Sequence, residues 1–501
     1  MFAAASASLS LLFSWPYILY PVVGTLLSML FAGLPGVGGA TLMALALPFV
    51  YDMETPAALL LFGAFVGGAT FMGSVSAILL GIPGKASNAA TALDGYRMAQ
   101  QGLAKTAIGC SATASALGST FGVVAFLALL PFLRDAILLF GPTEFLALGV
   151  WGLMTVALVT RGSSVKGLAA AALGILLTFV GGDPRTGQPR FTFDTLYLRD
   201  GLDFVLVFLG VFSLAEVIDL LASGRKTISG KQKLEDLRGS VWEGSLAVFR
   251  HWSLFLRSSV VGTVVGVVPG IGATISSFVA YGLAARSAGA ERSRFGHGDI
   301  RGVLAPEAAN DAKDGGSLAP ALVFGIPGGS GTAMLLMALE QQGVVPGRQL
   351  LTEHMDYVFL LVFSLFFSNW LTSILGVALV RPFAWLTVAP TALLIPFLLT
   401  FTVLGAFTYR GRIEDVFVVY LFGLFGYAMK KYGWSRPAFV IALVLGHLLE
   451  KNFIVAVRLH ELDRVRFWER PITMILVALT VASLYWMRSD SLWREKGDRP
   501  G

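Results

Sequence analysis

The sequence contains few charged residues and a large excess of apolar ones. Charged residues make up 14% of the 501 residues and apolar residues 55%, whereas a soluble globular domain carries about 25% charged residues. A soluble fold of this length could not bury so much apolar surface. Because a membrane-spanning helix needs about 20 mostly apolar residues, the apolar runs predict roughly 10–14 membrane-inserted segments. The strands of a membrane barrel would be shorter and would alternate, so the predicted fold class is an all-α, polytopic integral membrane protein.

Cysteine and histidine are scarce. Cys110 is the one cysteine, so no internal disulfide can form and no cysteine-based metal site can be built. The five histidines are dispersed, and no two have the HxxxH spacing of a helical zinc site. We therefore expect neither a structural metal nor a bound cofactor.

Basic residues are absent from the start of the chain, because no lysine or arginine precedes Lys85. The start therefore lacks the basic region of a cleavable signal peptide, and the first apolar run, Leu9 to Phe31, is expected to be a retained span.

The basic stretch "GRKTISGKQKLEDLRGSVWEG" (224–244) is the strongest linker candidate, and the positive-inside rule places it in the cytoplasm. Both flanks of the last apolar run are basic, which leaves the orientation of that end open. The net charge of +6 suits basic cytoplasmic loops, and we expect no nucleic-acid binding.

Three strings recur in the same order about 240 residues later in the chain. "GLPGVGGAT" matches "VVPGIGAT", "SAILLGIPGKASNAAT" resembles "APALVFGIPGGSGTAM", and "AQQG" resembles "EQQG". Three ordered matches predict an internal duplication, with halves that are inverted relative to each other across the membrane. The expected domains are a first half at 1–222, a cytoplasmic linker at 223–253, a second half at 254–487 and a polar tail at 488–501.

Each predicted half contains two Pro-Gly pairs within apolar sequence. Irregular backbone survives inside a membrane only where it is buried in protein or lines a watery cavity, and paired breaks of this kind point to the binding site of a transporter. A helix that begins at a break directs free N–H groups and a partial positive charge at the gap, which suits an anionic substrate without a charged lysine in the membrane. The expected breaks are Pro35-Gly36, Pro83-Gly84, Pro269-Gly270 and Pro327-Gly328.

Small polar side chains flank these breaks. They could bind a carboxylate or, together with backbone carbonyls, a sodium ion. Small residues also allow close packing between membrane helices. The sequence does not decide between ligand binding and packing for any single residue. The expected substrate-binding residues are Gly84, Ser87, Asn88, Thr274, Ser276, Gly328, Ser330 and Thr332.

The stretch "APEAANDAKDGG" (305–316) places several ionisable residues between apolar runs. Ionisable residues within a membrane are functional by default, although an ordinary wet loop is an equal alternative here. Asn310 and Asp311, together with Ser74, are the candidates for binding a coupling cation. The stretch "DPRTGQPRFTF" (183–193) predicts a turn-rich loop outside the membrane with strand-like ends.

These strings together resemble the large membrane subunit of the tripartite tricarboxylate transporter family, over about residues 24–472, and the region 295–339 is the most specific of them. The residues that carry the resemblance are "LPGVGGATLMALALPF", "GSVSAILLGIPGKASNAATALDGYRMAQQG", "GPTEFLALG", "DPRTGQPRFTF", "VVPGIGATISSFVAYGLAAR", "FGHGDIRGVLAPEAANDAKDGGSLAPALVFGIPGGSGTAMLLMAL" and "VLGHLLEKN".

The resemblance implies a secondary transporter for di- or tricarboxylates in the bacterial inner membrane, driven by a gradient of H⁺ or Na⁺. It also implies two partners, a small membrane subunit and a periplasmic solute-binding protein. The chain departs from the family pattern at three positions: Gly81 replaces Asn before the first "IPG", Asp311 replaces Asn in "ANNA", and His447 replaces Pro after "LG". Gly81 and Asp311 lie beside the presumed site, so the substrate or the coupling ion could differ from the family norm.

Two other classes of protein compete with a transporter. A polytopic membrane enzyme would need a catalytic constellation, and the sequence contains neither an HExxH pair nor a stretch long enough for a large soluble domain. An ion channel relies on symmetric oligomers or pore rings, whereas a duplication within one chain favours alternating access.

Overall fold

The computed structural model describes residues 1–34, 38–159, 164–224, 237–270, 272–386, 390–462 and 466–497. The expected break at Pro35-Gly36 and most of the expected basic linker lie outside the described residues. Helices make up nearly all of the described secondary structure, and two short strands form one hairpin. The all-α, polytopic class predicted from composition is confirmed.

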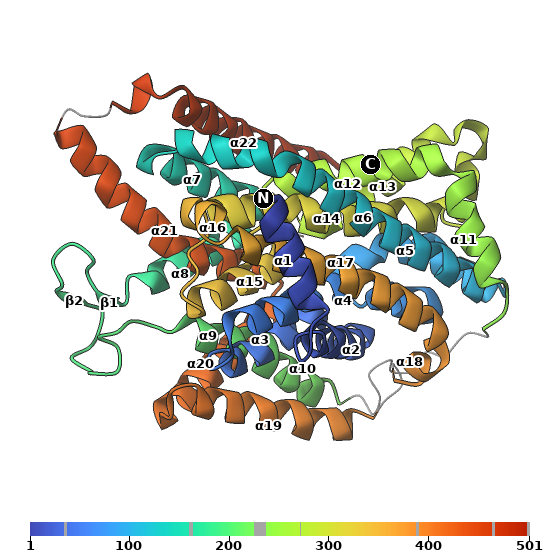
Figure 1. The fold of residues 1–501 in the computed structure, drawn as a ribbon, viewed down its shortest axis with the longest axis horizontal. Helices are drawn as coiled ribbons and strands as arrows, with labels where there is room; N and C mark the ends of the chain where they lie inside the picture. Colours follow the sequence, from blue (N-terminus) through green and yellow to red (C-terminus); the bar gives the residue numbers. More distant parts are fainter. Residues whose placement is uncertain are drawn as a thin grey trace. The chain divides into compact units, whose positions relative to one another are not determined.

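The chain folds as two compact units, each assembled from separate stretches of sequence (Figure 1). The first unit comprises Met1–Arg134, Val205–Val267 and Ile271–Tyr427, and the second comprises Asp135–Phe204, Val268–Gly270 and Ala428–Gly501. Each unit therefore draws on both halves expected from the sequence. The units are not those halves, and the repetition and inversion of the halves stay predictions.

The first unit holds most of the helices. In chain order they are α1 (Phe2–Leu12), α2 (Leu19–Gly33), α3 (Gly38–Val50), α4 (Thr55–Leu80), the short η1 (Ala86–Asn88), α5 (Ala89–Gln100), α6 (Ala104–Ala136), α9 (Phe204–Phe208), the π-helical η3 (Leu209–Leu214), α10 (Ala215–Ser223), α11 (Val241–Arg250), α12 (Trp252–Val267), α13 (Gly272–Ser287), η4 (Gly289–Arg294), α14 (Arg301–Leu318), the π-helical η5 (Ala319–Val323), α15 (Ser330–Gln341), α16 (Arg348–Thr352), α17 (Met355–Ala378), α18 (Val380–Leu386), α19 (Thr391–Arg410) and α20 (Ile413–Lys431).

The second unit is smaller and holds the remaining elements. They are η2 (Ile137–Leu139), α7 (Pro142–Val159), α8 (Ser164–Thr178), β1 (Gly181–Gly182), β2 (Pro189–Arg190), α21 (Arg436–Glu461), η6 (Phe467–Glu469) and α22 (Pro471–Gly497).

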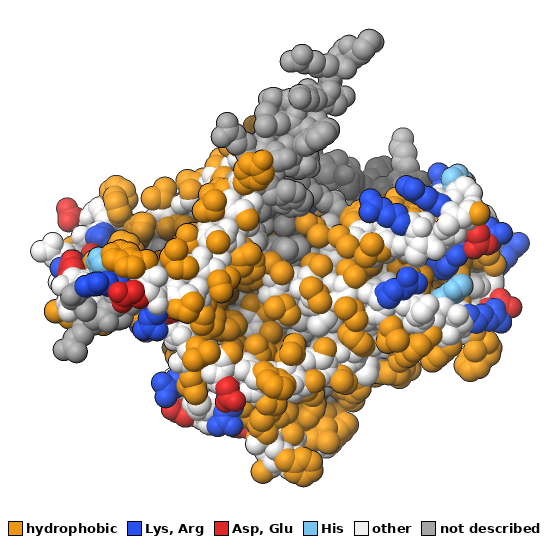
Figure 2. Space-filling model, turned by 90° about the horizontal axis from the view of Figure 1, so that it is seen from above, with side chains coloured by type: hydrophobic (Ala, Val, Ile, Leu, Met, Phe, Trp, Pro, Cys, Tyr) orange, Lys and Arg blue, Asp and Glu red, His pale blue; other side chains and the backbone are white. Residues whose placement is uncertain are grey.

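Six described helices are long and apolar enough to cross a membrane, and seven shorter helices are also apolar. The total number of these helices lies within the range of 10–14 membrane-inserted segments expected from the sequence, some of them too short to span the membrane completely. The expectation of one span from Leu9 to Phe31 is wrong, because α1 ends at Leu12 and α2 begins at Leu19. The sequence between them contains Pro16, which cannot donate a helical hydrogen bond. Figure 2 shows hydrophobic side chains over much of the visible face, as expected for surfaces in contact with lipid.

Helices α4 and α17 of the first unit pack closely against each other. Gly67 of α4 lies against the backbone of α17, so that a Cβ at this position would be 2.3 Å from the Leu365 carbonyl oxygen. The Ser364 and Ser368 hydroxyls donate to carbonyl oxygens of α4. Helices in a membrane associate through such small residues and hydroxyl hydrogen bonds because lipid supplies no hydrophobic driving force between them.

The expected loop at 183–193 contains a β-hairpin. Strands β1 and β2 pair antiparallel, and the Asp183 carboxylate accepts hydrogen bonds from the backbone N–H groups of Arg185 (2.7 Å) and Thr186 (2.9 Å) within the turn. The hydrogen bond from Thr186, with that from Arg185, lowers the pKa of Asp183 below its ordinary value. The turn within the stretch is confirmed, but its ends are not strands, because β1 precedes Asp183 and β2 ends at Arg190.

Candidate functional site

The described breaks of the first unit have the same local geometry at matching positions. α4 ends at Gly81 with φ +67°, and the helix that contains α14 and η5 ends before Gly325 with φ +67°. After each turn, a side chain three residues further on accepts the first backbone N–H: Asn88 accepts from Lys85 (3.1 Å), and Thr332 accepts from Gly329 (2.9 Å). The two recurring "GIPG" strings therefore build equivalent turn-and-cap structures.

Close packing holds the Pro83-Gly84 break against α4 and α2. The Gly84 N–H donates to the Gly73 carbonyl oxygen (3.1 Å), and a Cβ on Gly84 would lie 2.6 Å from Gly73 Cα and 2.7 Å from the Ala32 oxygen. Gly328 is less confined, since its nearest neighbour would be the Ser317 side chain at 3.1 Å. Gly84 therefore serves packing, and its N–H already has a backbone acceptor.

The helices that follow the breaks lie next to one another. α13, which follows Pro269-Gly270, packs against η1, which follows Pro83-Gly84. α3 packs against α15, which follows Pro327-Gly328. Pro269 and Gly270 themselves belong to the second unit, where the Pro269 carbonyl oxygen accepts a hydrogen bond from Thr155.

Three of the six polar residues expected to bind substrate have local partners. Asn88 donates to Ser74 Oγ (2.6 Å) and to the Thr70 carbonyl oxygen (3.3 Å), Thr332 caps α15, and the Ser276 hydroxyl donates to the Ala273 carbonyl oxygen (2.8 Å). Ser87 differs, because its hydroxyl is buried without a hydrogen-bond partner among the described residues. Thr274 and Ser330 are partly exposed.

Helix α14 carries three acidic residues on one face. Glu307, Asp311 and Asp314 are spaced four and three residues apart, so their side chains share a face of the helix. All three are buried, and α14 packs against α4, α5, α12 and α13. The stretch 305–316 is therefore a buried helix, and the alternative of a wet loop is wrong.

Glu307 is bound by hydroxyl groups from three helices. Its Oε1 accepts from Ser74 of α4 (2.7 Å) and from Thr91 of α5, and its Oε2 accepts from Ser111 (2.7 Å) and Ser115 (3.3 Å) of α6. An ionised carboxylate has about four lone-pair sites, so these four donors saturate it. The Glu307 side chain is therefore fixed in place by hydroxyl groups.

Asp311 lies one turn further along α14 and has fewer partners. Its Oδ1 accepts from Asn369 Nδ2 of α17 (2.7 Å), while its Oδ2 is buried without a partner among the described residues. The Asn369 Oδ1 and Asn310 Nδ2 atoms are also buried and lack partners within that part of the chain. Buried polar atoms normally have hydrogen-bond partners, so the two unsatisfied oxygens, Asp311 Oδ2 and Asn369 Oδ1, can accept a proton or a small cation.

Two lysines lie near the third acid. Lys313 forms an ion pair with Asp314, and Asp314 also accepts from Thr70 of α4 (3.4 Å). The Lys85 ammonium, which directly follows the Pro83-Gly84 break, donates to the same Thr70 hydroxyl (3.3 Å). The expectation of an anion site without a charged lysine stays a prediction, although the structure places Lys85 and Lys313 near the acidic face of α14, which the sequence analysis did not foresee. The sequence signal was present, because Lys85 and Lys313 are ionisable residues within apolar regions.

A hydrogen-bond chain connects the first break with the acidic helix. The Lys85 backbone N–H donates to Asn88, Asn88 donates to Ser74, and Ser74 donates to Glu307. A change in the position of the break therefore alters the environment of Glu307. Among the described residues, no group of three or more His, Cys, Asp or Glu side chains could hold a metal ion.

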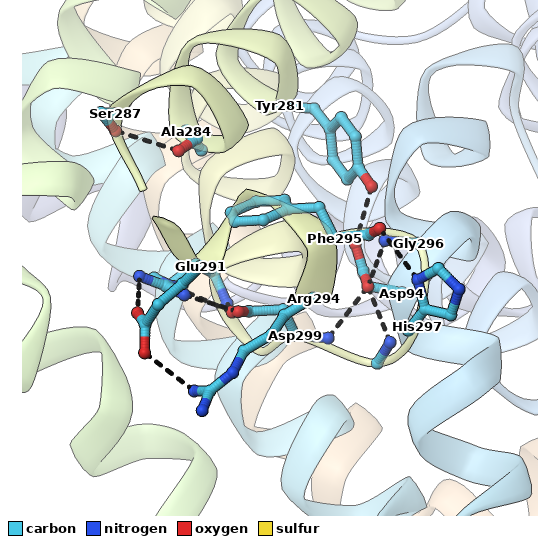
Figure 3. A network of polar contacts seen from close by, with 12 residues as sticks. Asp94, Tyr281, Ala284, Ser287, Glu291, Arg294, Phe295, Gly296, His297 and Asp299 are labelled. Carbon is cyan, nitrogen blue, oxygen red and sulfur yellow. Dashed lines mark hydrogen bonds and ion pairs between the residues drawn. The ribbon is translucent and has the colours of Figure 1, made fainter. Parts of the chain in front are cut away.

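Asp94 attaches the loop before α14 to helix α5 (Figure 3). Its Oδ1 accepts from the backbone N–H groups of Gly296, Gly298 and Asp299 (2.8, 2.8 and 2.9 Å), and its Oδ2 accepts from the Tyr281 hydroxyl (2.8 Å). Asp94 is fully buried. Although burial acts to raise the pKa of Asp299, hydrogen bonds from Arg301 outweigh it and leave that pKa below its ordinary value.

The comparison with protein families identifies the chain. The profile described as "Tripartite tricarboxylate transporter TctA family" matches residues 18–441. The chain belongs to this family. TctA proteins are the large transporter subunit of tripartite tricarboxylate transporters and are not enzymes. The TctA assignment therefore makes the chain a multi-pass transport protein that works with partner subunits.

Two similar proteins come from Agrobacterium vitis. "Uncharacterized 52.8 kDa protein in TAR-I ttuC' 3'region" is 33% identical over 469 residues, which are 93% of this chain and 92% of the relative. "Uncharacterized protein in TAR-II ttuC' 3'region" is 29% identical over 218 residues, which are 44% of this chain and 90% of the relative. No solved structure matches this TctA chain.

Proposed function

We propose that this TctA protein moves a small di- or tricarboxylate across the bacterial inner membrane and that the movement is driven by the entry of a cation, H⁺ or Na⁺. A small membrane subunit and a periplasmic solute-binding protein complete the transporter and deliver the substrate. The proposal rests above all on the buried acidic residues of α14, of which Asp314 shares the Thr70 hydroxyl with Lys85 in the break after α4.

The substrate carboxylate binds in this proposal near Lys85, Lys313 and the helices that begin after the breaks. Lysine ammonium groups attract carboxylates, and the first turn of a helix offers N–H groups and a partial positive charge. Ser87, whose buried hydroxyl lacks a partner among the described residues, can donate to the substrate. Asn88, Thr332 and Gly84 shape the site and brace it.

The coupling cation binds at Asp311 in this proposal. Glu307 already has four hydroxyl donors, whereas Asp311 has one oxygen without a partner among the described residues, and Asn369, which donates to its other oxygen, has an unsatisfied amide oxygen. A proton would bind Asp311 Oδ2 directly, and a sodium ion would bind Asp311 Oδ2 together with Asn369 Oδ1. Ser74 contributes by holding Glu307 rather than by binding the ion.

Gradient-driven uptake by proteoliposomes tests this function. The chain is reconstituted with its two partner subunits, and the uptake of radiolabelled carboxylates is measured with an imposed H⁺ gradient, an imposed Na⁺ gradient or neither. Gradient-dependent accumulation supports the proposal, and the effective gradient identifies the ion. Fast passive ion flux would identify a channel instead, and chemical turnover of a lipid would identify an enzyme.

The Asp311→Asn variant tests the coupling site separately. It keeps the shape of the side chain and removes the charge. We expect the uptake of substrate against its concentration difference to fall at least about tenfold, which is the effect of losing one charge-assisted interaction. Asp183→Asn, in the hairpin of the second unit, is the matched control and should transport normally. If Asp311→Asn accumulates substrate as the parent does, Asp311 does not bind the coupling ion.

A further inference from the structure

Helices α12 and α13 enclose a pocket that the proposed transport cycle does not use. Its volume is about 340 Å³. The walls are mainly apolar, and two arginines and two serines complete the lining: Leu254, Val261, Ala280 and Leu283, with Arg257, Arg286, Ser258 and Ser287.

Both arginines lie at the same end of this helix pair. α12 and α13 pack against each other and are joined at the Pro269-Gly270 end, so the start of α12 and the end of α13 lie side by side at the opposite end. Arg257 is in the second turn of α12, and Arg286 is in the last turn of α13. Neither guanidinium forms an ion pair with an acidic side chain in the part of the chain that the structure describes. The pocket therefore presents two uncompensated positive charges above an apolar interior.

Aromatic residues and neighbouring arginines surround this end of the helix pair. Trp252 stacks between Phe249 (ring centroids 6.0 Å apart) and Phe255 (4.8 Å) where α11 meets α12. Further along α12, Val260 and Val264 are exposed. Tryptophan and arginine collect where a membrane meets water, and exposed aliphatic side chains face the acyl chains. These residues are the kind that lie at the level of the lipid headgroups.

We propose that this pocket binds an anionic phospholipid, with the phosphate held by Arg257 and Arg286 and the upper acyl chain along Leu254, Val261 and Leu283. Basic pockets between membrane helices are known to take anionic lipid headgroups, and the charge and the apolar walls here match the two parts of such a molecule. This inference is independent of the proposed transport function, because none of these residues belongs to the site around α14.

Lipid binding by the purified chain tests the proposal. The protein in detergent is mixed with phosphatidylglycerol, with phosphatidylcholine or with inorganic phosphate, and retained lipid is counted by native mass spectrometry while the shift in thermal unfolding is recorded. We expect phosphatidylglycerol to bind in preference to phosphatidylcholine. Equal binding of the two lipids, or binding of inorganic phosphate as strong as that of phosphatidylglycerol, would overturn the inference.

Three variants separate the contributions of charge and shape. The double variant Arg257→Gln with Arg286→Gln should bind phosphatidylglycerol at least about tenfold more weakly, since each guanidinium–phosphate contact is charge-assisted. Val261→Phe fills the apolar part, keeps both arginines and should weaken lipid binding as well. Arg292→Gln, an exposed arginine of η4 outside the pocket, should bind as the parent does. Parental binding by either pocket variant, or an equal loss in Arg292→Gln, would show that the lipid binds elsewhere.

Discussion

At the scale of single residues, two carboxylates one helical turn apart have different environments. Glu307 receives four hydroxyl hydrogen bonds, and Asp311 receives one from Asn369 while its other oxygen lacks a partner among the described residues. Removing a partner from a buried charge is costly, whereas a carboxylate that begins with an open position can take up and release a cation. The spacing of acids along the sequence could not distinguish these roles, because the hydroxyl donors to Glu307 come from α4, α5 and α6.

Lys85→Met tests the residue proposed to attract the substrate. It keeps the apolar part of the side chain and removes the charge, so the apparent KM for the carboxylate should rise about tenfold or more, the value of one charge-assisted hydrogen bond. The measurement is initial uptake rate against substrate concentration in proteoliposomes.

Lys166→Met is the control for this change. Its ammonium donates to the Tyr432 carbonyl oxygen in the second unit, so its removal should leave the KM unchanged. An unchanged KM in Lys85→Met as well would place the substrate away from the Pro83-Gly84 break.

At the scale of elements, the two "GIPG" turns have matching caps and differ in how tightly they are packed. A Cβ on Gly84 would lie 2.6 Å from Gly73 Cα of α4 and 2.7 Å from the Ala32 oxygen of α2, whereas a Cβ on Gly328 would meet its nearest neighbour, Ser317 Cβ, at 3.1 Å. Backbone atoms cannot move aside without displacing a helix. The first turn is therefore the more rigid one, and the second is the better candidate for movement during transport.

Gly84→Ala and Gly328→Ala test this difference in packing. Overpacking costs about 1–3 kcal/mol where neighbours cannot adjust. We therefore expect Gly84→Ala to lower the unfolding temperature clearly and Gly328→Ala to lower it much less. Thermal unfolding of the purified proteins gives the order, and the reverse order would contradict the account of the two turns.

Asp94→Asn tests the attachment of the 295–299 loop to α5. The asparagine side chain has one acceptor oxygen, whereas the aspartate has two. Its NH₂ group would therefore face either the backbone N–H groups of the loop or the Tyr281 hydroxyl. Leaving buried donors unsatisfied costs about 1–3 kcal/mol, so the loop should become more accessible to proteases and the protein less stable.

Limited proteolysis followed by mass spectrometry measures this change directly. Tyr281→Phe removes only one of the four hydrogen bonds and should give a smaller effect. If Asp94→Asn is as resistant to cleavage as the parent, the loop is held by other contacts, such as the hydrogen bond from Gln101 to the His297 carbonyl oxygen.

At the scale of the whole molecule, the helices of one compact unit come from distant parts of the chain. The TctA assignment implies partner subunits, so the chain alone should show little uptake, and addition of the small membrane subunit and the solute-binding protein should restore it. Full-rate, high-affinity uptake by the purified chain alone would contradict a tripartite mechanism. The measurement is uptake by proteoliposomes that contain one, two or all three components.

The sequence by itself determined the class of protein and several local features. The free energy of transferring apolar side chains into a membrane is nearly additive along the chain, so composition sufficed to predict a helical membrane protein. The helix breaks near Pro83-Gly84 and Pro327-Gly328 and the turn within 183–193 were also predictable, because turn geometry depends on neighbouring residues.

Only the tertiary structure decided which polar residues meet. Ser74 and Glu307 are 233 positions apart, and Asn369 and Asp311 are 58 apart. A short sequence motif does not show which distant residues come into contact. Asn88 and Thr332, which were predicted as ligands, also cap the segments after the breaks, and the sequence did not show that Lys85 would meet Thr70 or that Thr70 would meet Asp314. The physical reason is that a hydroxyl or amide takes whichever partner packing brings within about 3 Å, and packing depends on all the helices at once.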